Sequence, residues 1–377
     1  MHCLALVSAV DPLLVDLTAL ALHGEEALVL TASLHDDGAP AAGGPSAPGA
    51  EDGFIRLTAA HVPFGDAEAA PVLDVARTTD CWTCSLREVL LAVVEDRARL
   101  ESDGATVVLL PPGVELIHLA PRLADDLARI PGAALAGLAH VIDVDTAARD
   151  LLTHQGLPGS VAVVEGRCAG ELHMVALGYA DVVVALGRDP VGRDLVEHLR
   201  PHDTLLLPGL DAPLLGELLA LCHDAGAAVA RVHPATTRAW GGPAEHGVRT
   251  LDLSSEMPFH PERLRELVED LAGHGLLARG CFWLPSRPGR VCAWEVAGGA
   301  VSVGDAGLWP GGSDGPPVPP RGHRRHRRRR VRARAHRLRR DPHAPRRARR
   351  CPRPGGRPRR AGGLVRSGLT RSRARGR

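Results

Sequence analysis

The chain has 377 residues, of which 45% are hydrophobic, and this length is sufficient for a main domain with a full core and a smaller second domain. The formal net charge is +1, but 25 of the 45 basic residues lie at 321–377 beside one acid, Asp341, so the preceding part is acidic. No apolar run reaches the ~20 residues that span a bilayer and residues 1–10 lack a cationic signal segment, so we expect a cytoplasmic protein that does not bind membranes.

Short apolar runs alternate with amphipathic segments along the first part of the chain. The runs predict strands at residues 4–7, 27–31, 106–110, 139–144, 181–186, 204–207 and 228–232. The amphipathic segments predict helices at residues 13–22, 85–100, 115–129, 191–199 and 212–222. Several runs are apolar throughout, as are strands that are buried on both faces. The pattern predicts an α/β fold with a mostly parallel sheet flanked by helices.

A second pattern follows an unpatterned stretch at residues 233–248. Pro261 is suited to the first turn of a helix at 261–274, and strands are expected at 276–284, 291–296 and 300–303, with turns at 286–289 and 298–299. These elements predict a small α+β domain. We therefore divide the chain into a first domain (1–232), a linker (233–249), a second domain (250–312) and an Arg/Pro-rich tail (313–377). Residues 38–53, rich in Gly, Ala, Pro and acids, predict a mobile surface loop.

The tail consists almost entirely of Arg, Pro, Gly, Ala and His, a composition that cannot form a packed core. One interpretation is a disordered cationic segment that binds nucleic acid such as rRNA through its phosphates. The other is the product of a shifted reading frame after about residue 312, which would leave the second domain truncated. The biased composition favours the frameshift, so no function is assigned to the tail.

Several motifs occur in a fixed order along residues 1 to about 310. Residues 258–264 (PFHPERL) precede a strand at 275–284 that ends in an aromatic-Trp pair. Residues 79–91 contain Cys81 and Cys84, with Thr83 between them. Two apolar runs, at 141–145 and 179–189, end in acids. This set resembles the CobW-like family of metal-linked P-loop GTPases, in which the cysteine motif is CxCC and the chain ends in a CobW C-terminal domain.

The resemblance implies a nucleotide site, but the residues that it requires are missing. A P-loop reads G-x-x-x-x-G-K-S/T, because backbone N–H groups and the Lys hold phosphate. The corresponding turn at residues 8–14 has no Gly, contains Asp11 and Pro12, and the chain has no Lys. The metal-linked E-x-S-G segment retains only Gly113, and the guanine-reading NKxD retains only Asp189. We expect vestigial nucleotide contacts at Gly113 and Asp189, no catalytic residue, no GTP cofactor and little or no GTP hydrolysis.

The eight cysteines are scattered along the chain, which predicts free thiols in a reducing compartment. Cys81 and Cys84 precede a predicted helix, whose N-terminus lowers the pKa of a thiol. Such a pair can supply two thiolate ligands to zinc, and His61 is a candidate for one of the two further ligands that a structural site requires. Redox chemistry and two unbonded thiols at a turn remain alternatives. We predict a zinc site at Cys81 and Cys84.

The degenerate P-loop, the reduced cysteine motif and the absence of Lys and Asn, which is typical of GC-rich coding, most resemble an actinobacterial branch of this family, the ribosome hibernation factor-recruiting factors. The resemblance implies a zinc-responsive adaptor that brings a hibernation factor to ribosomes when zinc is short. The alternative is a zinc metallochaperone that still uses GTP. A third possibility is a pseudogene product that folds and has no role.

Overall fold

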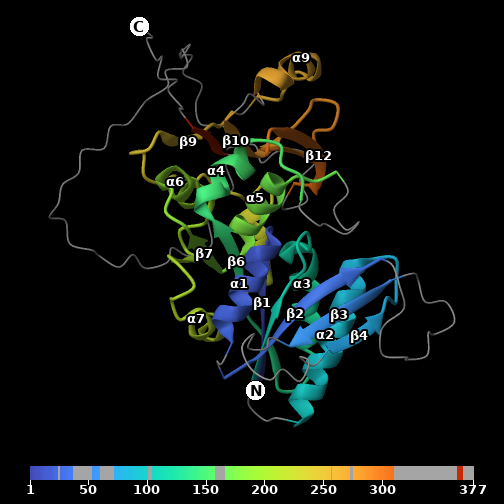
Figure 1. Cartoon of the computed structure of the whole chain (residues 1–377). Coiled ribbons are helices and arrows are strands. Elements are labelled where there is room, and N and C mark those ends of the chain that lie inside the picture. Colours follow the sequence, from blue (N-terminus) through green and yellow to red (C-terminus); the bar gives the residue numbers. More distant parts are fainter. Residues whose placement is uncertain are drawn as a thin grey trace, which may run out of the picture.

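The computed structural model describes residues 1–23, 26–36, 53–59, 72–100, 104–157, 166–255, 257–271, 275–309 and 363–367. These residues form two sheets with helices packed on them (Figure 1). None of the helices in this part of the chain is both long enough and apolar enough to cross a bilayer.

The first sheet has eight strands in the order β4-β3-β2-β5-β1-β6-β7-β8. Neighbouring strands run parallel from β2 to β8, and β3 and β4 extend one edge antiparallel. This confirms the predicted mostly parallel sheet. The strands are β1 (His2–Ala9), β2 (Leu28–His35), β3 (Phe54–Ala59), β4 (Val72–Ala76), β5 (Gly104–Leu109), β6 (Ala133–Asp143), β7 (Val182–Leu186) and β8 (Leu205–Leu207).

Helices cover both faces of the first sheet, which explains why its central strands are apolar throughout. Leu4 and Leu6 of β1 belong to a core that α2 and α3 complete on one face. Ala5 and Val7 point to the other face, where α1 and α7 cover them. The helices of this domain are α1 (Pro12–Leu22), α2 (Trp82–Leu100), α3 (Leu116–Leu127), α4 (Val144–Leu152), α5 (Ala169–Tyr179), α6 (Pro190–Leu199), α7 (Leu214–Ala220) and α8 (Ala225–Val232).

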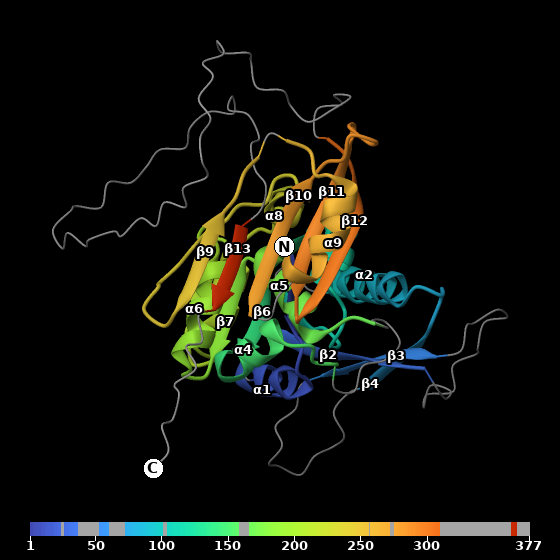
Figure 2. The ribbon, with the colours of Figure 1, turned by 90° about the horizontal axis from the view of Figure 1, so that it is seen from above.

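The second sheet is antiparallel and has five strands in the order β12-β11-β10-β13-β9. Figure 2 shows it lying over α4, α5 and α6 of the first domain. Its strand β13 comes from the Arg-rich tail, to which the sequence assigned no element. The elements of this domain are β9 (Val248–Asp252), α9 (Pro261–Leu271), β10 (Leu276–Phe282), β11 (Arg290–Ala297), β12 (Ala300–Leu308) and β13 (Gly363–Ser367).

The predicted strand at residues 228–232 is wrong, because these residues lie in α8. The Asp224 carboxylate caps this helix by accepting the Ala227 N–H at 2.9 Å, and alanine favours a helix over a strand. The sequence also gave no indication of β3, β4, β9, α4 or α5. The predicted mobile loop falls almost wholly at residues 37–52, outside the described residues.

The turn between β11 and β12 connects the two domains. Gly298 and Gly299 both have positive φ, 56° and 70°, as a tight hairpin turn requires. The Gly298 N–H donates to the Leu151 carbonyl at the end of α4, at 2.7 Å. A Cβ on Gly170 in α5 would lie only 2.6 Å from the Gly298 nitrogen, so the turn and the helix are in close contact. The two domains therefore pack together through backbone that has no room for side chains.

Candidate functional site

The carboxyl ends of β5, β1, β6 and β7 meet at one edge of the first sheet, because these strands are parallel neighbours. Open α/β sheets bind their ligands at this edge. A residue of interest lies at or after the end of each strand there. These residues are Gly113 after β5, Asp11 after β1, Asp143 as the last residue of β6, and Asp189 after β7. The edge is therefore where a nucleotide would bind.

The turn between β1 and α1 is too short to surround a phosphate. Only Val10 and Asp11 separate the end of β1 from Pro12, the first residue of α1. The Asp11 carboxylate accepts the Leu13 N–H at 2.9 Å and so caps the helix itself. A phosphate at this helix N-terminus would meet a carboxylate and a proline that has no N–H to donate.

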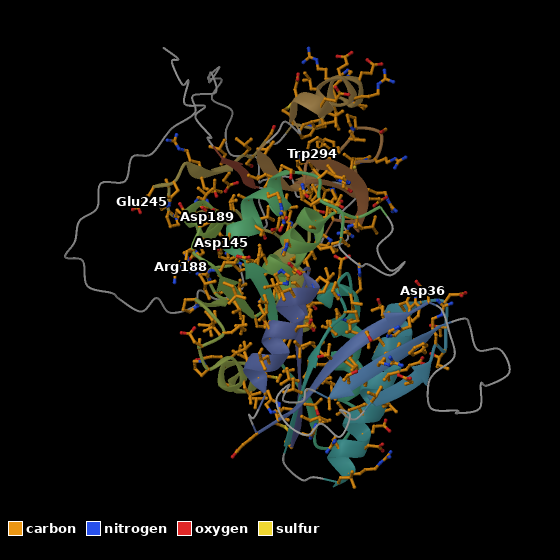
Figure 3. The ribbon with its side chains drawn as sticks, in the orientation of Figure 1. Asp36, Asp145, Arg188, Asp189, Glu245 and Trp294 are labelled. Carbon is orange, nitrogen blue, oxygen red and sulfur yellow. A yellow bond between two sulfur atoms is a disulfide. The ribbon has the colours of Figure 1, made fainter. Side chains whose placement is uncertain are left out.

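The Asp189 carboxylate is hydrogen-bonded to the backbone, so it does not project freely from the end of β7. Its carboxylate accepts the Gly192 N–H at 2.8 Å, which caps α6. The Asp145 carboxylate accepts the N–H groups of Arg188 and Asp189 at 2.7 and 2.6 Å, and Figure 3 labels these three residues. These two hydrogen bonds lower the pKa of Asp145 below its ordinary value. The site predicted at Asp189 is therefore a rigid, acidic turn.

Gly113 lies on the opposite side of β1 from Asp189 and lines a different space. Its φ of 94° turns the chain after β5. With Ser8, His140 and Tyr179 it lines a cavity of about 20 Å³, which has room for about one water molecule. Gly113 thus lies near the end of β1, whereas Asp189 lies on the other side of β6. The structure does not bring these two predicted residues together.

Two buried histidines lie beside this cavity, and the sequence analysis did not identify them. His140 Nδ1 is 3.0 Å from the Ser8 hydroxyl, and His140 Nε2 is 2.9 Å from His173 Nδ1. Desolvation is the main cause that holds the pKa of His140 well below its ordinary value, and burial lowers the pKa of His173 to about 4. Both rings are therefore neutral at pH 7. The available signal was His140 itself, a histidine in the otherwise mostly apolar run at 139–144.

The structure records Cys81 and Cys84 as a disulfide, so the prediction of free thiols is wrong for these two residues. Cys81 immediately precedes α2, and its sulfur accepts the Cys84 N–H at 3.2 Å. One helical turn separates the two Cα atoms by 5.2 Å, which lies within the range that a disulfide can bridge. Both sulfurs lie at the helix N-terminus, as predicted.

Several contacts hold the start of α2 independently of the sulfurs. The Ser85 hydroxyl accepts the N–H groups of Thr78 and Thr79 at 3.3 and 3.2 Å. Trp82 is 6% exposed, and the Arg77 guanidinium lies 4.8 Å from its ring centroid. The pair is thus attached to a well-packed helix end.

Reduction of this pair would provide two thiolate ligands for zinc. Among the described residues, no group of three or more His, Cys, Asp or Glu side chains is arranged to hold a metal ion. His61, the other candidate ligand, lies outside these residues. Cys81 and Cys84 therefore fit half of a four-ligand zinc site, and other groups would have to supply the rest.

Known proteins resemble this chain in both domains. Residues 248–334 match the family described as the cobalamin synthesis protein cobW C-terminal domain. A zinc chaperone of Mycobacterium tuberculosis, Rv0106, is 29% identical over 241 residues, which are 61% of this chain and 58% of that protein. An uncharacterized protein of Mycobacterium bovis matches with the same identity and coverage. The chain thus matches less than two thirds of the length of these relatives.

Two solved structures also align with the chain. The zinc-bound YjiA GTPase from E. coli gives a TM-score of 0.32 at 11% identity, covering 82% of this chain and 90% of that one. A zinc-bound triple mutant of YjiA gives 0.35 at 13% identity, with the same coverage.

Proposed function

Because the chain belongs to the CobW-like family of P-loop GTPases, we propose that it is a zinc-responsive member that has lost GTP hydrolysis and acts as an adaptor in the cytoplasm. When zinc is short, the adaptor brings a hibernation factor to ribosomes. The observation that carries the loss of catalysis is the two-residue turn between β1 and α1. Zinc responsiveness rests on Cys81 and Cys84 and on the likeness to a zinc chaperone.

The nucleotide-binding edge supports a role without turnover. Phosphoryl transfer depends on donors that neutralise the transferred phosphate, and a P-loop supplies them as a Lys and free N–H groups. Here Asp11 and Asp189 already accept the N–H groups at the starts of α1 and α6. A triphosphate placed at this edge would displace two helix caps and meet negative charge.

The arrangement of the cysteine pair supports reversible binding of zinc. Two thiolates leave two coordination positions for ligands from outside the pair, so zinc bound here would be released more readily than from a closed four-ligand site. The helix N-terminus favours the thiolate form after reduction. Zinc binding and disulfide formation compete for the same two sulfurs, which couples the response to the redox state of the pair.

Mixing the full chain with GTP and Mg²⁺ should release no phosphate above the buffer background, because the β1–α1 turn offers no phosphate cradle. The measurement is a phosphate-release assay across a GTP titration, with a CobW-like protein that has an intact G-x-x-x-x-G-K-S/T motif as the active control. Saturable turnover at a rate close to that of the control would contradict the proposal and support the alternative, a GTP-dependent zinc metallochaperone.

Affinity capture from zinc-starved and zinc-replete cells tests the adaptor role. We expect ribosomal proteins to co-purify with the wild-type chain under starvation only, and the Cys81→Ser/Cys84→Ser variant to lose this dependence on zinc. The control is Cys222→Ser, which replaces a free, exposed cysteine outside the pair. The adaptor proposal fails if ribosomal proteins are absent from the captured material in both conditions.

A further inference from the structure

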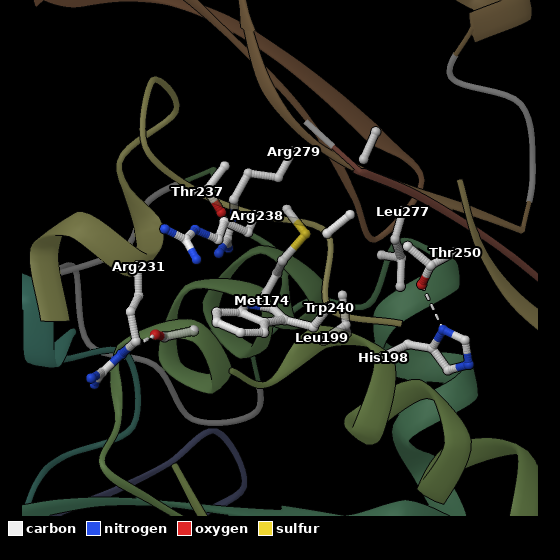
Figure 4. A pocket seen from close by; sticks show the side chains of 13 residues that line it. Met174, His198, Leu199, Arg231, Thr237, Arg238, Trp240, Thr250, Leu277 and Arg279 are labelled. Carbon is white, nitrogen blue, oxygen red and sulfur yellow. Dashed lines mark hydrogen bonds between the residues drawn. The ribbon is translucent and has the colours of Figure 1, made fainter. Parts of the chain in front are cut away.

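A cavity lies where the second sheet packs against the first domain. It is lined by α5, α6, the end of α8 with the segment that follows it, β9 and β10, and its volume is about 40 Å³. Three arginines contribute to its wall, namely Arg231, Arg238 and Arg279, together with Met174 and Trp240 (Figure 4). The space has room for a few water molecules or one small oxyanion.

Arg279 is held rigidly at this wall and retains a donor that has no acceptor. Its Nε atom donates to Glu295 at 3.3 Å, while its Nη2 atom is buried without a hydrogen-bond partner among the described residues. A Cβ on Gly178 would lie 2.8 Å from Arg279 Nη1, so the guanidinium packs directly on α5. A buried donor of a charged group without an acceptor is costly, and a bound anion would remove that cost.

The charge of the cavity wall is not balanced by protein groups. Arg231 donates to the Tyr179 carbonyl at 2.6 Å and to the Asp181 carboxylate at 3.2 Å. Arg279 is paired with Glu295 at 3.3 Å. Arg238 is exposed and makes no ion pair within the described part of the chain. The wall therefore has one positive charge in excess, next to the unsatisfied donor.

We propose that this cavity binds a small oxyanion of the phosphate class, either free or as the terminal group of a larger molecule. Guanidinium groups bind phosphate oxygens with short, charge-assisted hydrogen bonds. Arg279 would donate from the second domain and Arg238 from the segment after α8, so the anion would connect the two domains. This site is independent of the cysteine pair and of any ribosome partner.

Thermal unfolding of the full chain tests this site with inorganic phosphate at constant ionic strength, using chloride as the reference salt. We expect the Tm of the wild type to rise with the logarithm of the phosphate concentration once this exceeds the Kd, because a ligand of the folded state stabilises it. Arg238→Gln should weaken the apparent Kd at least about tenfold, and Arg279→Gln should abolish the shift. Arg129, whose side chain is 75% exposed, does not line the cavity, so Arg129→Gln should bind phosphate as the wild type does.

Two further measurements test the proposal even if the Arg279→Gln variant does not fold. Arg238 is exposed, so its variant should fold even if Arg279→Gln does not. The fluorescence of Trp240 should change with phosphate, and Trp240→Phe should remove this change. Tighter binding of a nucleoside monophosphate than of phosphate identifies a larger ligand, and the reverse identifies a free anion. A Tm that does not respond to phosphate, or a response that both Arg variants retain, overturns the proposal.

Discussion

Gly298→Ala should lower the free energy of unfolding by about 3 kcal/mol. At this residue φ is 56°, a conformation that is strained for a residue with a Cβ. The added Cβ would also overlap the sulfur of Cys168, which is fully buried at the start of α5. The turn would have to move away from α4 and break the hydrogen bond from Gly298 to the Leu151 carbonyl. Urea unfolding followed by circular dichroism measures the loss.

Gly304→Ala is the matched control, because it makes the same chemical change in the same hairpin. A Cβ on Gly304 has no atom within 4 Å, and its φ is not in the positive region. We expect its free energy of unfolding to stay within about 0.5 kcal/mol of the wild type. Equal losses in the two variants would show that the contact between the turn and α5 contributes nothing specific.

Acidification should destabilise the protein between pH 6.5 and about 4, before its carboxylates are protonated. The folded-state pKa of His173 is about 4, below the ordinary value of 6.5, so the unfolded chain binds a proton in this range and the folded chain does not. The contribution of His173 to the free energy of unfolding is fully present above pH 6.5. It is lost as the pH falls towards 4, and the total loss is about 3 kcal/mol. His140, whose pKa is also lowered, acts in the same direction.

Urea unfolding at pH 7 and pH 5 tests this expectation in the wild type, His173→Gln and His118→Gln. His173→Gln keeps a polar side chain but removes the titrating group, so its loss of stability between the two pH values should be smaller by about 2 kcal/mol. His118, with a side chain 62% exposed, is the matched control and should leave the loss unchanged. Asp181 has a pKa lowered below 3.8, so its contribution is retained at both pH values. If His173→Gln loses as much stability between pH 7 and pH 5 as the wild type does, the assignment of this loss to His173 is wrong.

The fold was largely predictable because most of its elements carry local signals. The apolar runs at 106–110 and 181–186 correspond to β5 and β7, and Pro261 does begin α9. The elements that depend on tertiary packing could not be predicted from the sequence. Helix α5 is buried on nearly all sides, so it shows no polar face and no clear helical period. Strand β13 pairs with β9 and β10, which are distant in sequence, so no local pattern indicates it.

The candidate site was predictable in part for the same reason. Asp11 and Pro12 are neighbours in sequence, and their effect on the turn follows from residue type alone. The contact between His140 and His173 depends on the packing of α5 against β6, and the cavity beside Arg279 exists only because the two domains meet. Local motifs carry no information on either arrangement.

The bond between Cys81 and Cys84 encloses a very short loop, with a sequence separation of only three residues. The conformational entropy that a crosslink removes from the unfolded chain grows with the length of the enclosed loop, so this bond restricts the unfolded ensemble little. The bond therefore contributes little to the stability of the folded state. Because Ser85 and Trp82 also hold the start of α2, we expect this helix to stay in place when the bond opens or closes.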